Sequence, residues 1–392
     1  MPFASIVAQE KITAQLLHDW EKTQLAPANL FVGGAFSGKS TTALEVARLI
    51  LCETKAEQCS CRACLMHRKL MHPRLFLLGN RYFKEEIRAS LQTMHAFIQH
   101  KKAIPDAVKL LVIQSLRKLI RRFDSALWES DDARYKEAKG LTVALNELLS
   151  EKIDTEHEIT AENLLMIEQK ALEVAEILHH YVINIGQIRS LIHHVGMLSG
   201  ESRVVIIEEA HLMQESARNA LLKILEEPQK ELYFILTTTN KQEMLPTILS
   251  RLRPYYFQER APEEQKRIIQ KVFRNNEIAT LDDLLSPLPL TQARDLANRF
   301  FTSAQASKSI YFTYNQEENA ILYQQLPAIL SQVKERVLQS TLPYPNKREL
   351  FLRIDQSYLG ARDYNQNPEI LLYTLHKEIQ RLCRKSEKSL NK

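Results

Sequence analysis

The stretch from Leu30 to Thr42, LFVGGAFSGKSTT, constrains the fold of this chain more than any other. It contains the pattern G-x-x-x-x-G-K-[ST], in which backbone N–H groups surround a phosphate, the lysine neutralises it and the hydroxyl residue holds Mg²⁺. The apolar NLFV before it predicts a buried strand, and STTALEVARLIL after it predicts a helix whose N-terminal dipole favours anions. We therefore expect an α/β domain with a nucleotide-phosphate loop. The candidate phosphate-binding residues are Gly33, Gly38, Lys39, Ser40 and Thr41.

One residue of this loop departs from the common form of the pattern. Many such loops carry a further glycine two residues before Gly38, where this chain has Phe36. A bulky side chain restricts the backbone there if φ must be positive. The sequence therefore leaves open whether the loop binds Mg²⁺ and ATP.

Three further apolar runs, RLFLLGN, SRVVIIEEA and LYFILTTTN, are bounded by turn signals and alternate with helical periodicity. Such runs are typical of strands buried on both faces of a parallel sheet. Between the second and third strands, at about residues 81–182, apolar residues recur at spacings of three and four, which indicates helices. We expect an α/β domain over residues 1–257 that carries a helical insertion. The clearest stripe comprises Leu110, Ile113, Leu116, Ile120, Phe123 and Leu127.

The rest of the chain predicts further domains. A chain of 392 residues exceeds the roughly 250 to 300 residues at which one hydrophobic core stops growing. After Phe257 the strand pattern ends, Pro262 begins a helix, and helical periodicity continues, with breaks near residues 286–289 and 301–307. We expect a helical lid over 258–303 and an all-α collar domain over 304–392.

An acidic pair follows the third strand. RVVIIEEAH places Glu208 and Glu209 where a Walker-B pair orders Mg²⁺ and polarises the attacking water. The first acid of such a pair is usually Asp, and the longer Glu208 would displace the metal by about an ångström, a misplacement that costs roughly 100-fold in rate. The alternative is that these acids only hydrate a loop at a strand end.

Four cysteines lie close together after the first helix of the phosphate loop. Their order is Cys52, six residues, Cys59, one residue, Cys61, two residues and Cys64. Four thiolates can hold Zn²⁺ tetrahedrally and so fold a loop that has no core of its own. The alternative is a reduced, metal-free loop.

The segment QESARNALLKILEEPQKELYFILTTTNKQEMLPTILSRLRPYYF closely resembles the AAA+ clamp-loader subunits of bacterial DNA polymerase III. Their hallmark is a NALLK-LEEP helix, a sensor 1 strand and a Ser-Arg-Cys motif. FASIVAQ, PANLFVGG and INIGQIRSL are similar to the same family. The resemblance implies that Thr239 or Asn240 is sensor 1 and that Arg251 is an arginine finger, which stabilises charge on a neighbouring subunit's phosphoryl group. Leu252 replaces the usual Cys. Without the family context, Arg251 would be a surface salt bridge.

The resemblance also implies partners and a role. The family's gamma and delta prime subunits carry a four-cysteine zinc module at this point, usually with two CxxC pairs, and here Cys59 and Cys61 are one residue too close. Phe36 and Glu208 differ from the residues usual at these positions in an ATP-hydrolysing subunit, whereas Arg251 is kept. This combination favours a delta prime-like subunit. Such a subunit joins gamma/tau and delta in a hetero-pentamer that loads a sliding clamp onto primer-template DNA. The alternatives are a gamma/tau-like motor and an unrelated P-loop scaffold.

Charge and hydropathy add little. The net charge of +5 is small against 52 basic and 47 acidic residues, so phosphate polyanions would have to bind at local patches. We expect a cytoplasmic protein without a membrane segment, because no secretory signal opens the sequence and no apolar run approaches membrane-spanning length. The basic cluster Arg117, Lys118, Arg121 and Arg122 could face DNA, but no aromatic residues interleave with it, which favours a solvated helix face.

Overall fold

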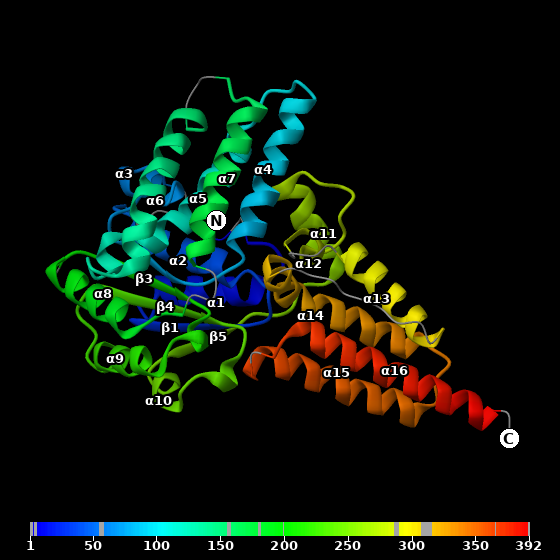
Figure 1. Cartoon of the computed structure of the whole chain (residues 1–392). Coiled ribbons are helices and arrows are strands. Elements are labelled where there is room, and N and C mark those ends of the chain that lie inside the picture. The colour runs from blue at the N-terminus through cyan, green and yellow to red at the C-terminus, as the bar shows by residue number, and fades with distance from the viewer. Residues whose placement is uncertain are drawn as a thin grey trace. The chain divides into compact units, whose positions relative to one another are not determined.

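A computed structural model describes residues 3, 6–54, 59–154, 158–178, 182–198, 200–285, 290–306, 316–364 and 366–390. Figure 1 shows its helices and strands. The described chain divides into two compact units, Met1–Leu281 and Asp282–Lys392. None of the described helices combines the length and apolar character that crossing a bilayer requires.

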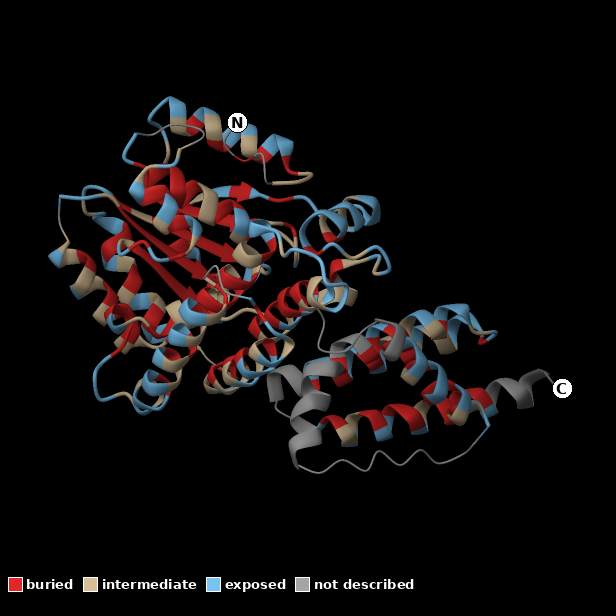
Figure 2. Cartoon of the chain, turned by 90° about the horizontal axis from the view of Figure 1, so that it is seen from above, coloured by how far each residue is buried: buried red, intermediate tan, exposed pale blue. Residues whose placement is uncertain are grey.

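The first unit is built on a parallel sheet. Among the described residues, its strands are β1 (Ala28–Val32), β2 (Leu75–Gly79), β3 (Arg203–Glu208), β4 (Leu232–Thr238) and β5 (Arg253–Tyr256). They lie in the order β2-β3-β4-β1-β5, and each neighbouring pair is parallel. Figure 2 shows that the inner strands are buried along their length. The predicted α/β fold with a parallel sheet is thus confirmed.

Helices cover both faces of this sheet. Successive strand residues contribute alternately to two apolar clusters, so that Phe31 and Ile206 pack on α1 and α2, whereas Leu30 and Ile207 face the opposite layer. The helices of this unit outside the insertion are α1 (Glu10–Glu21), α2 (Lys39–Leu51), α3 (Arg62–Arg68), α8 (Ile185–Met197), α9 (Glu215–Glu226), α10 (Pro246–Leu249) and α11 (Pro262–Ile268). A π-helical turn, Ile269–Phe273, extends α11.

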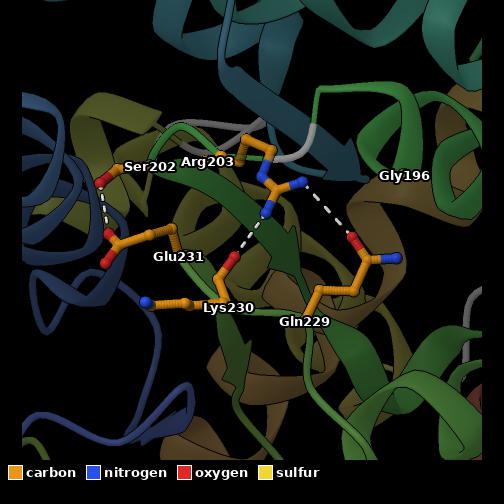
Figure 3. Close-up of a pocket in the computed structure, with 7 residues that line it drawn as sticks. Gly196, Ser202, Arg203, Gln229, Lys230 and Glu231 are labelled. Atoms are coloured by element: carbon orange, nitrogen blue, oxygen red, sulfur yellow. Dashed lines mark hydrogen bonds between the residues drawn. The ribbon is translucent and has the colours of Figure 1, made fainter.

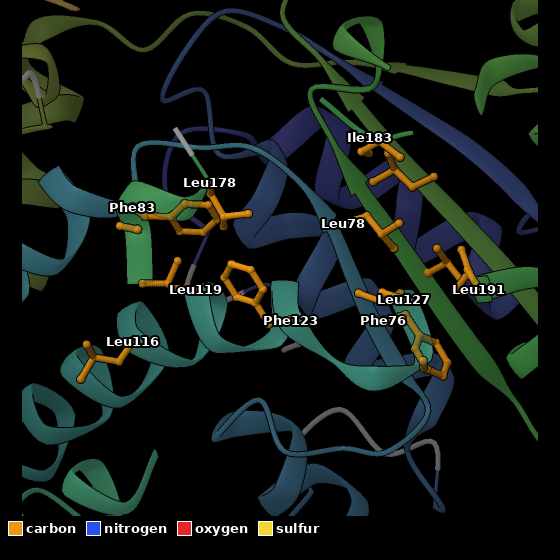
Figure 4. Close-up of a cluster of buried hydrophobic side chains, with 14 of the residues drawn as sticks. Phe76, Leu78, Phe83, Leu116, Leu119, Phe123, Leu127, Leu178, Ile183 and Leu191 are labelled. Atoms are coloured by element: carbon orange, nitrogen blue, oxygen red, sulfur yellow. The ribbon is translucent and has the colours of Figure 1, made fainter. Parts of the chain in front are cut away.

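The predicted helical insertion is confirmed, and it shares the core of the sheet. Its helices are α4 (Phe83–Gln99), α5 (Asp106–Ile120), α6 (Ala133–Lys152) and α7 (Ala161–Ile177), with 3₁₀ turns at Arg121–Phe123 and Ser125–Leu127. Leu116, Phe123 and Leu127 of the predicted stripe are buried in one cluster with Phe76 and Leu78 of β2 (Figure 4). The insertion therefore packs against β2 and shares the core on that face of the sheet with α8 and α9.

The second unit is helical. Its elements are α13 (Leu290–Gln305), α14 (Gln316–Gln339), α15 (Tyr344–Tyr364) and α16 (Pro368–Leu390), while α12 (Leu281–Leu285) lies at the division between the units. Phe301 of α13 is buried in one cluster with Val333, Ile354 and Leu375. Because α13 packs with α14 and α16, residues 258–303, predicted as a lid, are divided between the two units. The predicted break at 286–289 lies outside the described residues.

Candidate functional site

The loop between β1 and α2 contains two residues in the left-handed conformation. Phe36 has φ of +55° and Gly38 has φ of +96°, so a phenylalanine occupies the left-handed conformation, which costs on the order of 1 kcal/mol or more for a residue with a side chain. The Phe36 ring packs against Tyr82, with centroids 4.9 Å apart. This contact compensates for the strain and places the first residues of the insertion beside the loop.

Other parts of the chain also hold the loop. The Arg260 guanidinium donates to the carbonyl of Phe36 at 2.6 Å. A Cβ on Gly38 would lie only 2.5 Å from a nitrogen of the same guanidinium. The Gln9 amide donates to the carbonyl of Ser37 at 3.0 Å. The motif gave no signal for Arg260 or Gln9, because both reach the loop only through the fold.

The lysine of the motif is turned into the loop. Lys39 is 6% exposed, and its ammonium donates to the carbonyls of Gly33 and Gly34, at 2.7 Å each. Burial lowers the pKa of Lys39, and the negative charges of Glu209 and Glu208 oppose that shift. The charges of the acidic pair thus favour the protonated form of the loop lysine.

Glu208 does not lie free at the end of β3. Its carboxylate pairs with Arg81 at 2.9 Å and with Arg122. Burial raises the pKa of Glu208, but the charges of Arg81 and Arg122 outweigh this and hold it at about 2. Both carboxylate oxygens are thus engaged by guanidinium groups. This carboxylate does not fit a Mg²⁺ site, because both of the oxygens that would bind the metal are already paired with fixed cations.

The second acid faces the sensor strand. Glu209, with φ of +48°, accepts hydrogen bonds from the backbone N–H of Thr239 at 3.2 Å and from its hydroxyl at 2.7 Å. The Asn240 amide instead donates to Glu243 at 2.7 Å. Of the two sensor 1 candidates, Thr239 is therefore the one that contacts the acidic pair.

The expected solvated helix face is wrong. Arg117 and Arg122 are 3% and 2% exposed, and the Lys118 ammonium pairs with buried Glu86. Arg121 donates to the carbonyl of Leu75. Arg117 donates to the carbonyl of Lys69 at 2.9 Å. These cations are buried because carboxylates and backbone carbonyls compensate their charge, and buried charges persist only when so paired.

Arg251 follows α10 on the surface of the first unit. Its guanidinium donates to the carbonyl of Thr247 at 2.6 Å and pairs with Glu226 of α9 at 2.5 Å. The two side chains are 31% and 49% exposed. Within one chain, Arg251 thus forms a half-exposed salt bridge, the alternative that the sequence left open.

The predicted metal-binding cysteines converge. Among the described residues, Cys52, Cys59, Cys61 and Cys64 place their Sγ atoms within 4.8 Å of one another. The backbone N–H of Cys61 donates to Cys59 Sγ at 3.3 Å, and that of Cys64 donates to Cys61 Sγ at 3.5 Å. Burial raises the pKa of Cys52, but hydrogen bonds from Thr54 reverse the shift and lower it to about 6. The donor set and the N–H···S contacts fit a group that could hold Zn²⁺.

A cavity of about 640 Å³ lies at the starts of β3 and β4, the edge of the sheet opposite Glu208 (Figure 3). Arg203 there donates to the carbonyls of Val195 and Lys230, at 2.5 and 2.6 Å, and Ser202 donates to Glu231. Because its polar side chains bond to the protein itself, the cavity is not part of the candidate site. Its other lining residues are Gly196, Gly200 and Gln229.

Comparisons with known proteins agree with these features. The model of the family described as DNA polymerase III, delta subunit matches residues 8–128 and 141–261, which is more than half of the chain. Three relatives are DNA polymerase III subunits: gamma/tau of Mycobacterium tuberculosis, 38% identical over 86 residues, tau of Escherichia coli, 34% over 80, and delta prime of Escherichia coli, 44% over 57. The aligned segments cover 22%, 20% and 14% of this chain and 15%, 12% and 17% of the three relatives, respectively.

A solved structure of a DNA polymerase III gamma subunit-related protein from Thermotoga maritima also matches. It is 18% identical, and the alignment covers 55% of this chain and 90% of that one. The TM-score is 0.32, which is too low to support an argument.

Proposed function

Because the chain belongs to the family described as DNA polymerase III, delta subunit, we propose that it is a delta prime-like subunit of a clamp loader. The observation that carries this proposal is the state of Glu208, which is bound by Arg81 and Arg122, while Arg251 remains half-exposed on the surface. Such a chain would use ATP slowly or not at all. It would serve the nucleotide site of a neighbour instead.

In the proposed assembly this chain joins gamma/tau and delta subunits in a ring of five, in the cytoplasm. The second, helical unit serves as the collar that holds the ring together. The ring opens a sliding clamp with ATP and closes it on primer-template DNA, and this chain reaches clamp and DNA through the complex. The four cysteines bind one Zn²⁺, which stabilises the loop before α3.

Arg251 is the group that would act on the neighbour. A guanidinium placed against a transferring phosphoryl group is worth roughly 1,000-fold or more in rate. To reach it, Arg251 must leave Glu226. An exposed ion pair of this kind stabilises by about 1 kcal/mol or less, so the salt bridge of the single chain opposes the proposed role only weakly.

A gamma/tau-like motor is the second candidate. This candidate is supported by the sequence identity with the gamma/tau and tau relatives over the aligned segments. The phosphate loop also keeps Gly38, Lys39 and Ser40 of its motif. In that case the isolated chain would bind Mg·ATP tightly and hydrolyse it.

Reconstitution of the clamp loader with purified subunits separates the two candidates. We expect Arg251→Ala to lower the DNA-stimulated ATPase of the assembly and Lys39→Ala to change it little. Arg267→Ala, an exposed arginine of α11, is the matched control, and gel filtration verifies that each variant assembles. The reverse pattern, with Lys39→Ala inactive and Arg251→Ala normal, would favour the motor.

A further inference from the structure

We propose that Arg81 and Arg122 of the helical insertion form a fixed cationic pair that takes the place of Mg²⁺ beside Glu208. The phosphate-loop module would then hold its arrangement without metal or nucleotide. The inference deepens the proposed function, on which it rests, by naming the residues that remove this site from metal-dependent chemistry.

The two ion pairs of Glu208 occupy the carboxylate oxygens that would bind a metal. One Glu208 oxygen lies 2.9 Å from an Arg81 nitrogen, and the other pairs with Arg122. Two guanidinium groups carry the same charge as one Mg²⁺, and guanidinium stays protonated at any relevant pH. The local charge balance is therefore met by side chains alone.

Arg122 is held too firmly to swing aside. It is 2% exposed, its Nε donates to the carbonyl of Gly79 at 2.8 Å, and its guanidinium lies over the Phe83 ring, 5.3 Å from the centroid. The indole N–H of Trp128 donates to the backbone carbonyl of Arg122 at 2.7 Å. A charge surrounded in this way has no hydrated alternative nearby, so withdrawing it from Glu208 would break a buried ion pair and leave the carboxylate with Arg81 alone.

Arg81 is fixed by a second acid. It lies 2.8 Å from Glu86, whose other oxygen pairs with Lys118. Both acids are buried, at 8% exposure for Glu86 and 5% for Glu208. The chain of alternating charges therefore runs from the end of β3 into α4 and α5.

Gly79 makes this contact between distant elements feasible. It pairs with Glu208 across β2 and β3, and a Cβ at Gly79 would lie 2.0 Å from the carbonyl oxygen of Glu208. Without a side chain there, the ends of both strands approach closely. One guanidinium, that of Arg122, can then bond to the Gly79 carbonyl and the Glu208 carboxylate together.

The test compares two neighbouring acids in metal-free buffer. For a metal-binding acid, Glu→Gln in EDTA relieves repulsion and leaves the melting temperature unchanged or raised. For Glu208→Gln we expect the opposite, a fall of about 6 °C or more, because two buried guanidinium groups each lose a carboxylate partner. Glu209→Gln is the matched control, since the Glu209 carboxylate accepts hydrogen bonds from the uncharged Thr239. The melting temperature of this variant should fall by less. A Glu208→Gln protein as stable as the wild type in EDTA would overturn the proposal.

A measurement on the wild-type chain covers the case in which Glu208→Gln fails to fold. The affinity for a fluorescent ATP analogue is compared in saturating Mg²⁺ and in EDTA. We expect any binding to differ by less than about threefold, and tighter binding in Mg²⁺ by tenfold, which is about 1.4 kcal/mol, would refute the cationic pair. If this happens while Arg251→Ala still lowers the ATPase of the assembly, the proposed function stands and only this inference fails.

Discussion

The Arg251 guanidinium pairs with the Glu226 carboxylate at 2.5 Å and so links the turn after α10 to the last residue of α9. If Arg251 acts on a neighbouring subunit, this pair competes with its function. We expect Glu226→Ala to keep or raise the DNA-stimulated ATPase of the reconstituted assembly, by at most about fivefold, because an exposed pair is worth about 1 kcal/mol or less. Steady-state phosphate release measures this effect.

The double variant Glu226→Ala/Arg251→Ala serves as the control for that experiment. It should behave like Arg251→Ala alone, since the glutamate then has no partner to restrain. A loss of activity in Glu226→Ala that equals the loss in Arg251→Ala would instead mean that the salt bridge itself is the functional element.

Zinc binding is the second prediction. Metal analysis of protein purified without chelator should give about one equivalent of zinc, because four thiolates that converge within 4.8 Å satisfy one tetrahedral ion. Cys61→Ser should lower that content and the melting temperature. Cys383→Ser, a buried cysteine of the second unit, should keep the zinc. Finding no metal in the wild-type protein would rule the site out.

The third prediction concerns Gly79. Its φ is +94°, and a Cβ there would meet the Glu208 backbone at 2.0 Å. Gly79→Ala should therefore destabilise the first unit by about 3 kcal/mol or more, through strain and loss of the strand contact. Gly140→Ala is the control, because a Cβ at Gly140 meets nothing within 4 Å, and this helical position should gain up to about 1 kcal/mol. Urea unfolding of both variants decides the point.

The fourth prediction is a dependence of stability on pH. The pKa of Glu208 falls from 4.5 to about 2 in the folded chain, so the native state releases this proton more readily than the unfolded state. Its contribution, on the order of 3 kcal/mol, is complete above pH 4.5 and is lost as the pH falls towards 2. Acid titration of the free energy of unfolding should give a shallower slope for Glu208→Gln than for the wild type. Equal slopes would show that the carboxylate is not held by its arginines.

Local sequence patterns predicted the phosphate loop and the buried strands, because neighbouring residues determine these elements. The phosphate loop follows from its motif, and the four long buried strands follow from their apolar runs. The strand β5 was not predicted, because it has four residues and its burial alternates between exposed and covered positions. The cysteine spacing predicted a metal group, and the fold brings the four sulfur atoms together as that requires.

The cationic pair could not be predicted from the sequence. Arg122 lies 86 positions from Glu208 along the chain, and a run of basic residues on a helix usually faces solvent. The tertiary structure overrides that rule here: the end of α5 and the 3₁₀ turn after it pack against carboxylates and carbonyls of β2, β3 and α4. Lysine and arginine patterns alone carry no information about such an edge.

The core that β2 shares with the insertion has a consequence for any shortened form of this chain. Phe76 and Leu78 of β2 are buried in one cluster with Phe123 and Leu127, which follow α5. A chain cut back to the sheet and its other helices would expose this apolar surface of β2 to water. Such a fragment should aggregate rather than fold as a smaller version of the same unit.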